Sequence, residues 1–155
     1  MKKVFALMLA LMLIMAAAAC KAPKPVDSVP AATGQAATTT QDNGDIQMTV
    51  KEQTIAGDAE SIALTINNTS DKEYIYGAMF TIETEKDGHW EAVEPVSEVF
   101  WDTAAYILNP GQSREETDWI ENYYGTLASG NYRIVKVFTS EDGTNLTAYG
   151  AFAVK

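Results

Sequence analysis

The feature that most constrains the fold is an alternation of apolar and polar residues that begins at Asp45. Apolar side chains occupy every second position in residues 46–50 and again in residues 62–66. This period of two indicates β-strands that bury one face. Further strands are expected over residues 73–85, 104–108, 113–120, 132–139 and 146–154, with a return strand that starts at Trp90. No convincing helical period is present in residues 45–155, although residues 115–124 could hold one helical turn.

Turn sequences separate these strands. The Asp-Gly pair at 87–88 favours a two-residue hairpin, because both of its central positions need a positive φ. The Asn-Pro-Gly-Gln tetrad at 109–112 suits a type II turn, and a second Asp-Gly pair at 142–143 marks another tight hairpin. Seven or eight short strands joined by turns over about 110 residues predict an all-β, antiparallel β-sandwich.

The first 19 residues differ from the rest of the chain. Two lysines precede an unbroken apolar run from Val4 to Ala19 that ends in alanines, which is the pattern of a secretory signal peptide. A transmembrane helix is the rival interpretation. The apolar run would span roughly 24 Å as a helix, which is shorter than the ~30 Å hydrocarbon core of a bilayer.

The segment from Ala17 to Cys20 resembles the lipobox of bacterial lipoproteins, although Ala17 stands where Leu is usual. The resemblance implies that residues 1–19 are a lipoprotein signal peptide. It also implies that Cys20, the only cysteine, becomes the first residue and carries acyl chains such as palmitate. Several chains would anchor the protein, since each buried CH2 contributes about 0.8 kcal/mol. The alternative is an ordinary secreted protein in which Cys20 is incidental.

Residues 21–44 contain three of the five prolines and no aromatic residue. Because they offer few large apolar side chains, ordering them would not be offset by burial. We therefore expect residues 20–44 to form a lipid-anchored flexible tether and residues 45–155 to form the folded domain. The alternative is a poorly patterned first strand within this segment.

Charge and composition exclude several classes of function. Removing Lys2 and Lys3 with the leader leaves 9 basic against 21 acidic residues, a net charge of -12 that disfavours nucleic-acid binding. One Cys and the single His89 exclude a disulfide framework, a zinc cluster and a Cys-His pair. The sequence therefore predicts no metal, no cofactor and no enzymatic activity. Four acidic residues are interpreted as a solvated face rather than a calcium site, because no calcium-binding loop motif is present: Glu115, Glu116, Asp118 and Glu121.

A Leu-x-x-Gly-x-Tyr spacing runs from Leu127 to Tyr132, just before a late strand. It is similar to the start of the sixth strand in immunoglobulin-like domains, which implies that Tyr132 forms a tyrosine corner. Together with Trp119, the Tyr-Gly pairs at 76–77 and 124–125, and residues 132–136, it resembles bacterial immunoglobulin-like domains. These domains occur on small lipoproteins, mostly of Gram-positive bacteria. The resemblance covers about residues 50–154 and implies an immunoglobulin-like sandwich on the extracytoplasmic face of the cell membrane.

Aromatic residues concentrate in the otherwise polar span 100–124. Exposed Trp and Tyr are enriched at binding hot spots, so Trp101, Tyr123 and Tyr124 are candidate anchors for a partner. The alternative is that these rings pack over the open end of the sandwich beneath a long loop.

We expect a non-catalytic interaction module at the cell envelope, held to the membrane by its N-terminal lipid. Its partner would be an unknown protein or a wall glycan, and the domain itself would be monomeric. A structural or accessory subunit of a membrane complex is the alternative, and a small hydrolase with an unrecognised site is a remote one.

Overall fold

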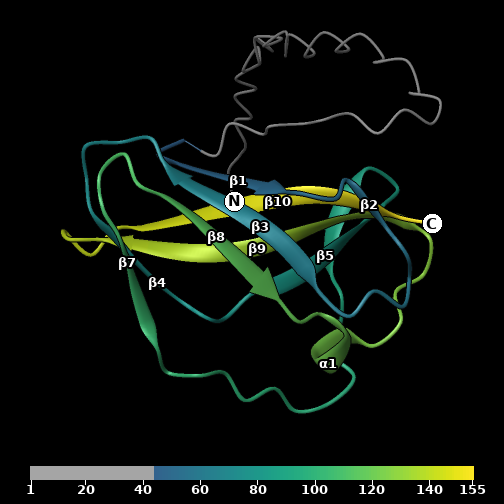
Figure 1. Cartoon of the computed structure of the whole chain (residues 1–155). Coiled ribbons are helices and arrows are strands. Elements are labelled where there is room, and N and C mark those ends of the chain that lie inside the picture. Colours follow the sequence, from purple (N-terminus) through teal and green to yellow (C-terminus); the bar gives the residue numbers. More distant parts are fainter. Residues whose placement is uncertain (1–43) are drawn as a thin grey trace, which may run out of the picture. The chain divides into compact units, whose positions relative to one another are not determined.

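The computed structural model describes residues 44–155. These residues form ten strands, arranged in two sheets, and one short helix (Figure 1). The elements in chain order are β1 (Ile46–Val50), β2 (Thr54–Ile55), β3 (Ile62–Asn68), β4 (Tyr74–Gly77), β5 (Thr81–Lys86), β6 (His89–Ala92), β7 (Ala105–Leu108), β8 (Ser113–Asp118), α1 (Glu121–Tyr124), β9 (Gly130–Ser140) and β10 (Asn145–Val154).

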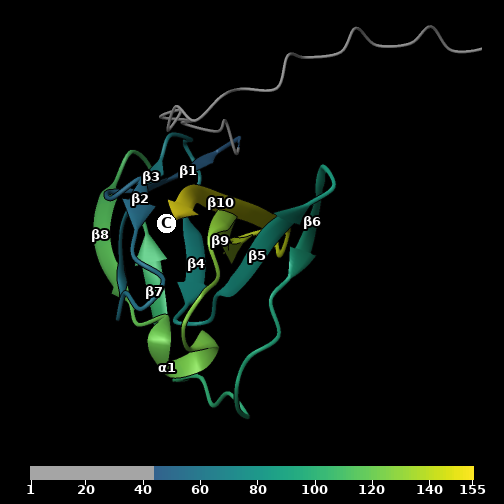
Figure 2. The same ribbon diagram turned by 90° about the vertical axis from the view of Figure 1, so that its right-hand side faces the viewer.

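The strands are arranged as two facing layers (Figure 2). The smaller sheet has the order β1-β3-β8 and is antiparallel throughout. The larger sheet has the order β2-β10-β9-β4-β7, and β5 pairs with β9 on one side and with β6 on the other. Only the short β2–β10 pair is parallel among the described strands. The predicted all-β sandwich is therefore confirmed.

Alternating burial explains why these segments form strands with one inward face. In β1 the residues at positions 46, 48 and 50 are buried, and those between them are only partly covered. Met48 lies opposite Ile66 of β3, so the apolar rows of the two strands meet on the same side. In β9 the buried row runs from Tyr132 to Ser140 at every second residue. Burying these rows between the sheets supplies the main favourable term in folding.

The predicted turns are present with the expected backbone signs. Asp87 and Gly88 have φ values of 51° and 77°, as a type I′ hairpin requires. Gly111 has φ 68°, and the amide of Gln112 donates to the carbonyl of Asn109 at 3.0 Å, which closes the type II turn.

Two features of the sheets differ from the sequence expectation. The segment expected as one strand over residues 73–85 is divided into β4 and β5. Between the Tyr76–Phe138 pair and the Thr81–Val135 pair, the register against β9 moves by two residues, so extra residues are accommodated there as in a bulge. The two-residue β2 was not expected either, because so short a strand carries no periodic signal.

Candidate functional site

Four aromatic residues, Phe80, Trp101, Tyr123 and Tyr124, form what we call the aromatic cluster. It lies at the end of the sandwich that carries α1 (Figure 1). The ring centroids of Trp101 and Tyr123 are 4.5 Å apart, and that of Phe80 is 4.9 Å from Trp101 and 5.8 Å from Tyr123. These separations are those of favourable aromatic pairs.

The loop between β6 and β7 brings Trp101 to this end. The amide of Val93 donates to the carbonyl of Ile82, and the amide of Val96 donates to the carbonyl of Tyr123, each at 2.8 Å. The single helical turn α1 ends at Gly125, whose φ of 62° is readily adopted by glycine. Backbone hydrogen bonds therefore hold the loop against α1, and this brings the rings of Trp101 and Tyr123 into contact.

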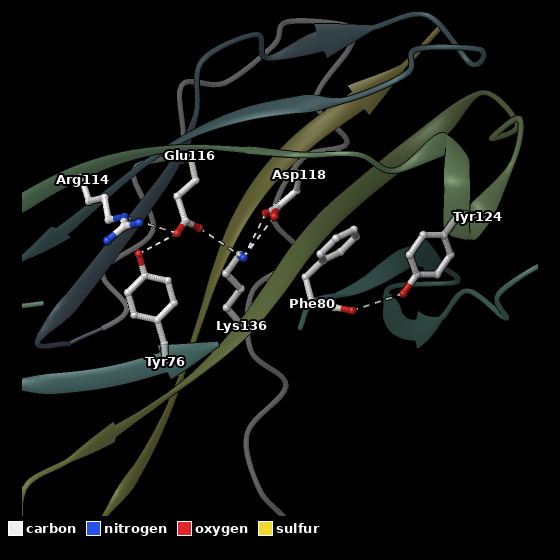
Figure 3. Close-up of polar contacts among 7 residues, drawn as sticks. All are labelled: Tyr76, Phe80, Arg114, Glu116, Asp118, Tyr124 and Lys136. Carbon is white, nitrogen blue, oxygen red and sulfur yellow. Dashed lines mark hydrogen bonds and ion pairs between the residues drawn. The ribbon is translucent and has the colours of Figure 1, made fainter. Parts of the chain in front are cut away.

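The prediction that Tyr124 is an exposed anchor is wrong. Its ring is buried, and its hydroxyl donates to the carbonyl of Phe80 at 3.5 Å (Figure 3). The same hydroxyl accepts from the amide of Ile82 at 3.2 Å. Burial raises the pKa of the Tyr124 phenol. Residues 78–80 between β4 and β5 are irregular, and the phenol provides a hydrogen-bond partner for one of their backbone groups, the carbonyl of Phe80.

Trp101 and Tyr123 are half-buried against the core, so the structure gives each a packed face and an accessible one. The most exposed aromatic side chains of the span are ones the sequence did not single out as anchors. Phe100 is 81% exposed and Trp119 is 53% exposed. Trp119 follows the inward-facing Asp118, so strand alternation turns it outward.

This end of the molecule is acidic. Between Asp87 and Tyr132, Arg114 is the only Lys or Arg. Its guanidinium already has partners within the domain. Nε lies 3.6 Å from a Glu116 oxygen, and Cζ lies 4.3 Å from the ring centroid of Tyr106. Exposed carboxylates occur on the loop and on α1, namely Glu94, Glu98, Asp102 and Glu121.

A second unusual feature is a buried ionic cluster of Lys136, Glu116 and Asp118 between the sheets (Figure 3). Lys136 of β9 is only 2% exposed, and its Nζ lies 3.2 Å from Oε2 of Glu116 and 3.2 Å from each oxygen of Asp118. Oε1 of Glu116 accepts a hydrogen bond of 2.6 Å from the hydroxyl of Tyr76. The cluster therefore joins β8 of one sheet to β9 and β4 of the other.

The cluster is incompletely hydrogen-bonded. Glu116 Oε2 and Asp118 Oδ2 receive no hydrogen bond within residues 44–155, although both lie at ion-pair distance from Nζ. Burial raises the pKa of Asp118 to about 6, and the opposing attraction of Lys136 does not cancel this. Burial and the neighbouring Glu116 also raise the pKa of Tyr76.

The interpretation of the four acidic residues as a solvated face is therefore wrong for Glu116 and Asp118. Strand alternation in β8 turns Glu115 and Thr117 outward and the other two inward. The missed signal was Lys136, which occupies the inward row of β9 with Ile134 and Phe138.

Tyr132, expected to form a tyrosine corner, lies at the start of β9 with a buried ring. Its hydroxyl donates to the carbonyl of Ala128, four residues upstream, at 2.8 Å. The ring stacks on Phe152 of β10, with centroids 5.7 Å apart. A tyrosine hydroxyl bonded back to nearby backbone is the geometry of such a corner.

Cys20, the leader and the tether up to residue 43 lie outside the described residues. Within residues 44–155, helices of the length and apolarity that a bilayer span needs are lacking. The same residues contain no group of three or more His, Cys, Asp or Glu side chains arranged to hold a metal ion. His89 is exposed beside the 87–88 turn.

A family model described as a bacterial Ig-like domain matches residues 42–151. Among curated proteins, no match was found. Of the solved structures, the archaellum periplasmic stator protein of Sulfolobus acidocaldarius is 14% identical with a TM-score of 0.38, over 69% of this chain and 99% of that one. The DNA-bound alkylpurine DNA glycosylase of Pseudomonas fluorescens is 17% identical with a TM-score of 0.38. That match covers 72% of this chain but only 30% of the glycosylase. Likenesses this low say nothing about ligands or activity.

Proposed function

The chain belongs to the bacterial Ig-like domain family, and from this premise we propose that its sandwich is a non-catalytic binding module. Its contact surface is the end that carries α1. The observation that supports this most directly is the exposure of Phe100 and Trp119 beside the half-buried Trp101 and Tyr123. Large aromatic side chains at a surface are costly to leave in water and are the residues most enriched at binding hot spots.

The partner is a protein with a basic surface. Exposed carboxylates of the loop and of α1 border the aromatic side chains, and Arg114, nearer the other end of β8, is turned to Glu116 and Tyr106. A Lys or Arg of the partner could stack on an exposed ring while it approaches Glu98 or Asp102. Complementary charge of this kind acts mainly on the rate of association.

The proposal includes export and a lipid anchor at Cys20, with residues 21–44 as the tether. The support is the leader pattern and the position of the only cysteine. Metabolic labelling with a palmitate analogue tests it. Label is expected in the wild-type chain and absent from Cys20→Ala, and label that persists in the variant would contradict the anchor.

Crosslinking on intact cells followed by pulldown tests the contact surface. The variants are Phe100→Ser and Trp119→Ser, which remove exposed side chains without opening the core. Each is expected to lower the yield of the crosslinked partner about tenfold, the effect typical of a hot-spot residue. The matched control is Ile107→Ser on β7, which is 52% exposed but lies on the outer face of the larger sheet.

Equal yields from all four chains would show that this end is not the contact surface. Recovery of wall polysaccharide in place of a protein, with the same dependence on Phe100 and Trp119, would show that the surface is right and the partner class wrong. A basic protein partner should also associate more slowly as salt is raised, because surface charges are screened.

A further inference from the structure

Lys136 is held between two carboxylates in the interior of the sandwich. Its side chain is 1% exposed, and those of Glu116 and Asp118 are each 10% exposed. Removing three ionisable groups from water costs free energy that their mutual attraction repays only when every oxygen is well bonded. Two carboxylate oxygens of this cluster are without a hydrogen bond among the described residues. The arrangement is therefore poor as a resting ion pair and calls for another account.

We propose that Lys136 and Asp118 become joined by an intramolecular amide bond between Nζ and Cγ, with Glu116 as the group that moves the proton. The proposal concerns the interior of the domain and does not depend on the binding function proposed above. It makes β8 and β9, which belong to opposite sheets, covalently continuous.

The reacting groups are already in place. Nζ lies 3.2 Å from both oxygens of Asp118, so the carbon that joins these oxygens is within reach of the amine without any backbone movement. Rotation about the Cβ–Cγ bond of Asp118, whose torsional preference is broad, presents the face of the carboxyl carbon to Nζ. Groups held in this way react as if at an effective concentration of about 10⁵ M or more.

Burial makes the neutral forms that such a reaction needs easier to reach than they are in water. Nζ also lies 5.7 Å from the ring centroid of the buried Phe80, so an aromatic ring as well as the two carboxylates surrounds the amine group. In a dry interior, passing the proton of the Lys136 ammonium to Asp118 replaces two buried charges by a neutral amine and a neutral acid. Burial raises the pKa of Asp118 to about 6, so its acid form is easier to reach than that of an exposed aspartate.

The step balances without any co-reactant. The Nζ lone pair attacks Cγ of the protonated Asp118, and Glu116 Oε2 accepts a proton from the amine. Glu116 then returns that proton to the departing hydroxyl of Asp118, the C–O bond breaks and one water leaves. Nζ keeps one hydrogen in the amide product. The protein loses one water, nothing is oxidised or reduced, and Glu116 ends as the carboxylate it was.

The other partners of Glu116 suit this role. Its Oε1 is held by the hydroxyl of Tyr76 at 2.6 Å and by Arg114 at 3.6 Å, which leaves Oε2 directed at Nζ (Figure 3). After condensation the amide N–H can donate to Oε2, and Arg114 still balances the charge of Glu116. The product therefore removes two ionisable groups from the interior.

Peptide mapping of the purified full-length chain tests the bond. Trypsin cuts after Lys and Arg, so an unlinked chain yields separate peptides 115–133, 134–136 and 137–155. The linked chain blocks cleavage at Lys136 and yields one branched peptide. That peptide joins residues 115–133 to 134–155 and weighs about 18 Da, one water, less than the two together. Unlinked peptides from folded wild-type chain would overturn the proposal.

Two variants test whether Glu116 is the group that moves the proton. Glu116→Gln has the same size but cannot accept the proton, and it is expected to give the unlinked peptides. Glu115→Gln, on the outward face of the same strand, is the matched control and should remain linked. A fully linked Glu116→Gln chain would overturn the role of Glu116. Should that variant fail to fold, the wild-type map still decides whether the bond exists.

Discussion

The hydroxyl of Tyr76 donates a hydrogen bond of 2.6 Å to Oε1 of Glu116, and in doing so it joins the two sheets through the core. Tyr76 also packs its ring against Phe138, with centroids 4.9 Å apart. One residue therefore combines apolar packing with a polar contact to a buried carboxylate. Losing only the polar part should be measurable.

Tyr76→Phe retains the ring and removes the hydroxyl. We expect it to lower the free energy of unfolding by about 1.5–3 kcal/mol, the range for a hydrogen bond to a charged group. Urea denaturation measures the change. Tyr106→Phe on β7 is the control, because its ring packs beside Tyr76 but takes no part in the ionic cluster. A loss of equal size in both variants would contradict the special role of the Tyr76 hydroxyl.

Lys136→Met prevents the amide bond proposed above and leaves Glu116 and Asp118 buried without a cation. Loss of the buried cation alone is expected to lower the free energy of unfolding by about 3–5 kcal/mol, and loss of the bond adds to this. A triple variant that combines Lys136→Met, Glu116→Gln and Asp118→Leu buries no charge and should recover part of this loss. Denaturant unfolding compares the three chains. A triple variant less stable than Lys136→Met would show that unpaired charge is not the cause.

Gly57→Ala should destabilise the fold although Gly57 lies in a loop. A Cβ at this position would lie 2.5 Å from the carbonyl oxygen of Leu127, whose amide donates to the carbonyl of Gly57 at 2.8 Å. Backbone must move to relieve the contact, so we expect a cost of about 1–3 kcal/mol by thermal or chemical unfolding. Gly130→Ala is the control, because its Cβ would meet only the Tyr132 ring at an ordinary 3.5 Å.

Asp142 should make the β9–β10 turn sensitive to acid. Its Oδ1 accepts from the hydroxyl of Ser140 at 2.6 Å and from the amide of Thr144 at 2.9 Å. The Ser140 hydrogen bond is the main cause that lowers the pKa of Asp142 to about 2, from 3.8. The folded carboxylate holds its proton less tightly than the unfolded one. Its contribution is therefore complete above pH 3.8 and is lost as pH falls toward about 2.

Asp142→Ala measures this contribution. The variant should melt at a lower temperature than the wild type at pH 7, and the difference should shrink as the pH is lowered from 4 toward 2. Melting curves at a series of pH values, followed by far-UV circular dichroism, provide the comparison. A difference that stays constant over that range would show that the carboxylate charge has no part in stabilising the turn.

Most of the sandwich could be predicted because strand alternation and turn chemistry are local properties. The consecutive residues Asp87 and Gly88, and the Pro-Gly dipeptide within 109–112, identify their turns from backbone preferences alone. The division between β4 and β5 could not be predicted in this way. It depends on a change of register against β9, a strand more than 50 residues later in the chain.

The candidate site shows the same division between what local sequence patterns predict and what depends on distant residues. The inward position of Lys136 in β9 was missed although strand alternation implies it, and its partners Glu116 and Asp118 come from the opposite sheet, which no local pattern shows. Likewise, the crowding of aromatic residues between 100 and 124 is visible in the sequence, whereas the burial of Tyr124 depends on its contacts with Phe80 and Ile82.

The sequence by itself determined the strand segments, their inward rows and the turns between them, because each depends on the conformational preferences of neighbouring residues. Only the tertiary structure decided which charged side chains are paired in the interior and which aromatic rings face the solvent. Burial and charge pairing are set by residues that are distant in the chain and meet only when the two sheets pack.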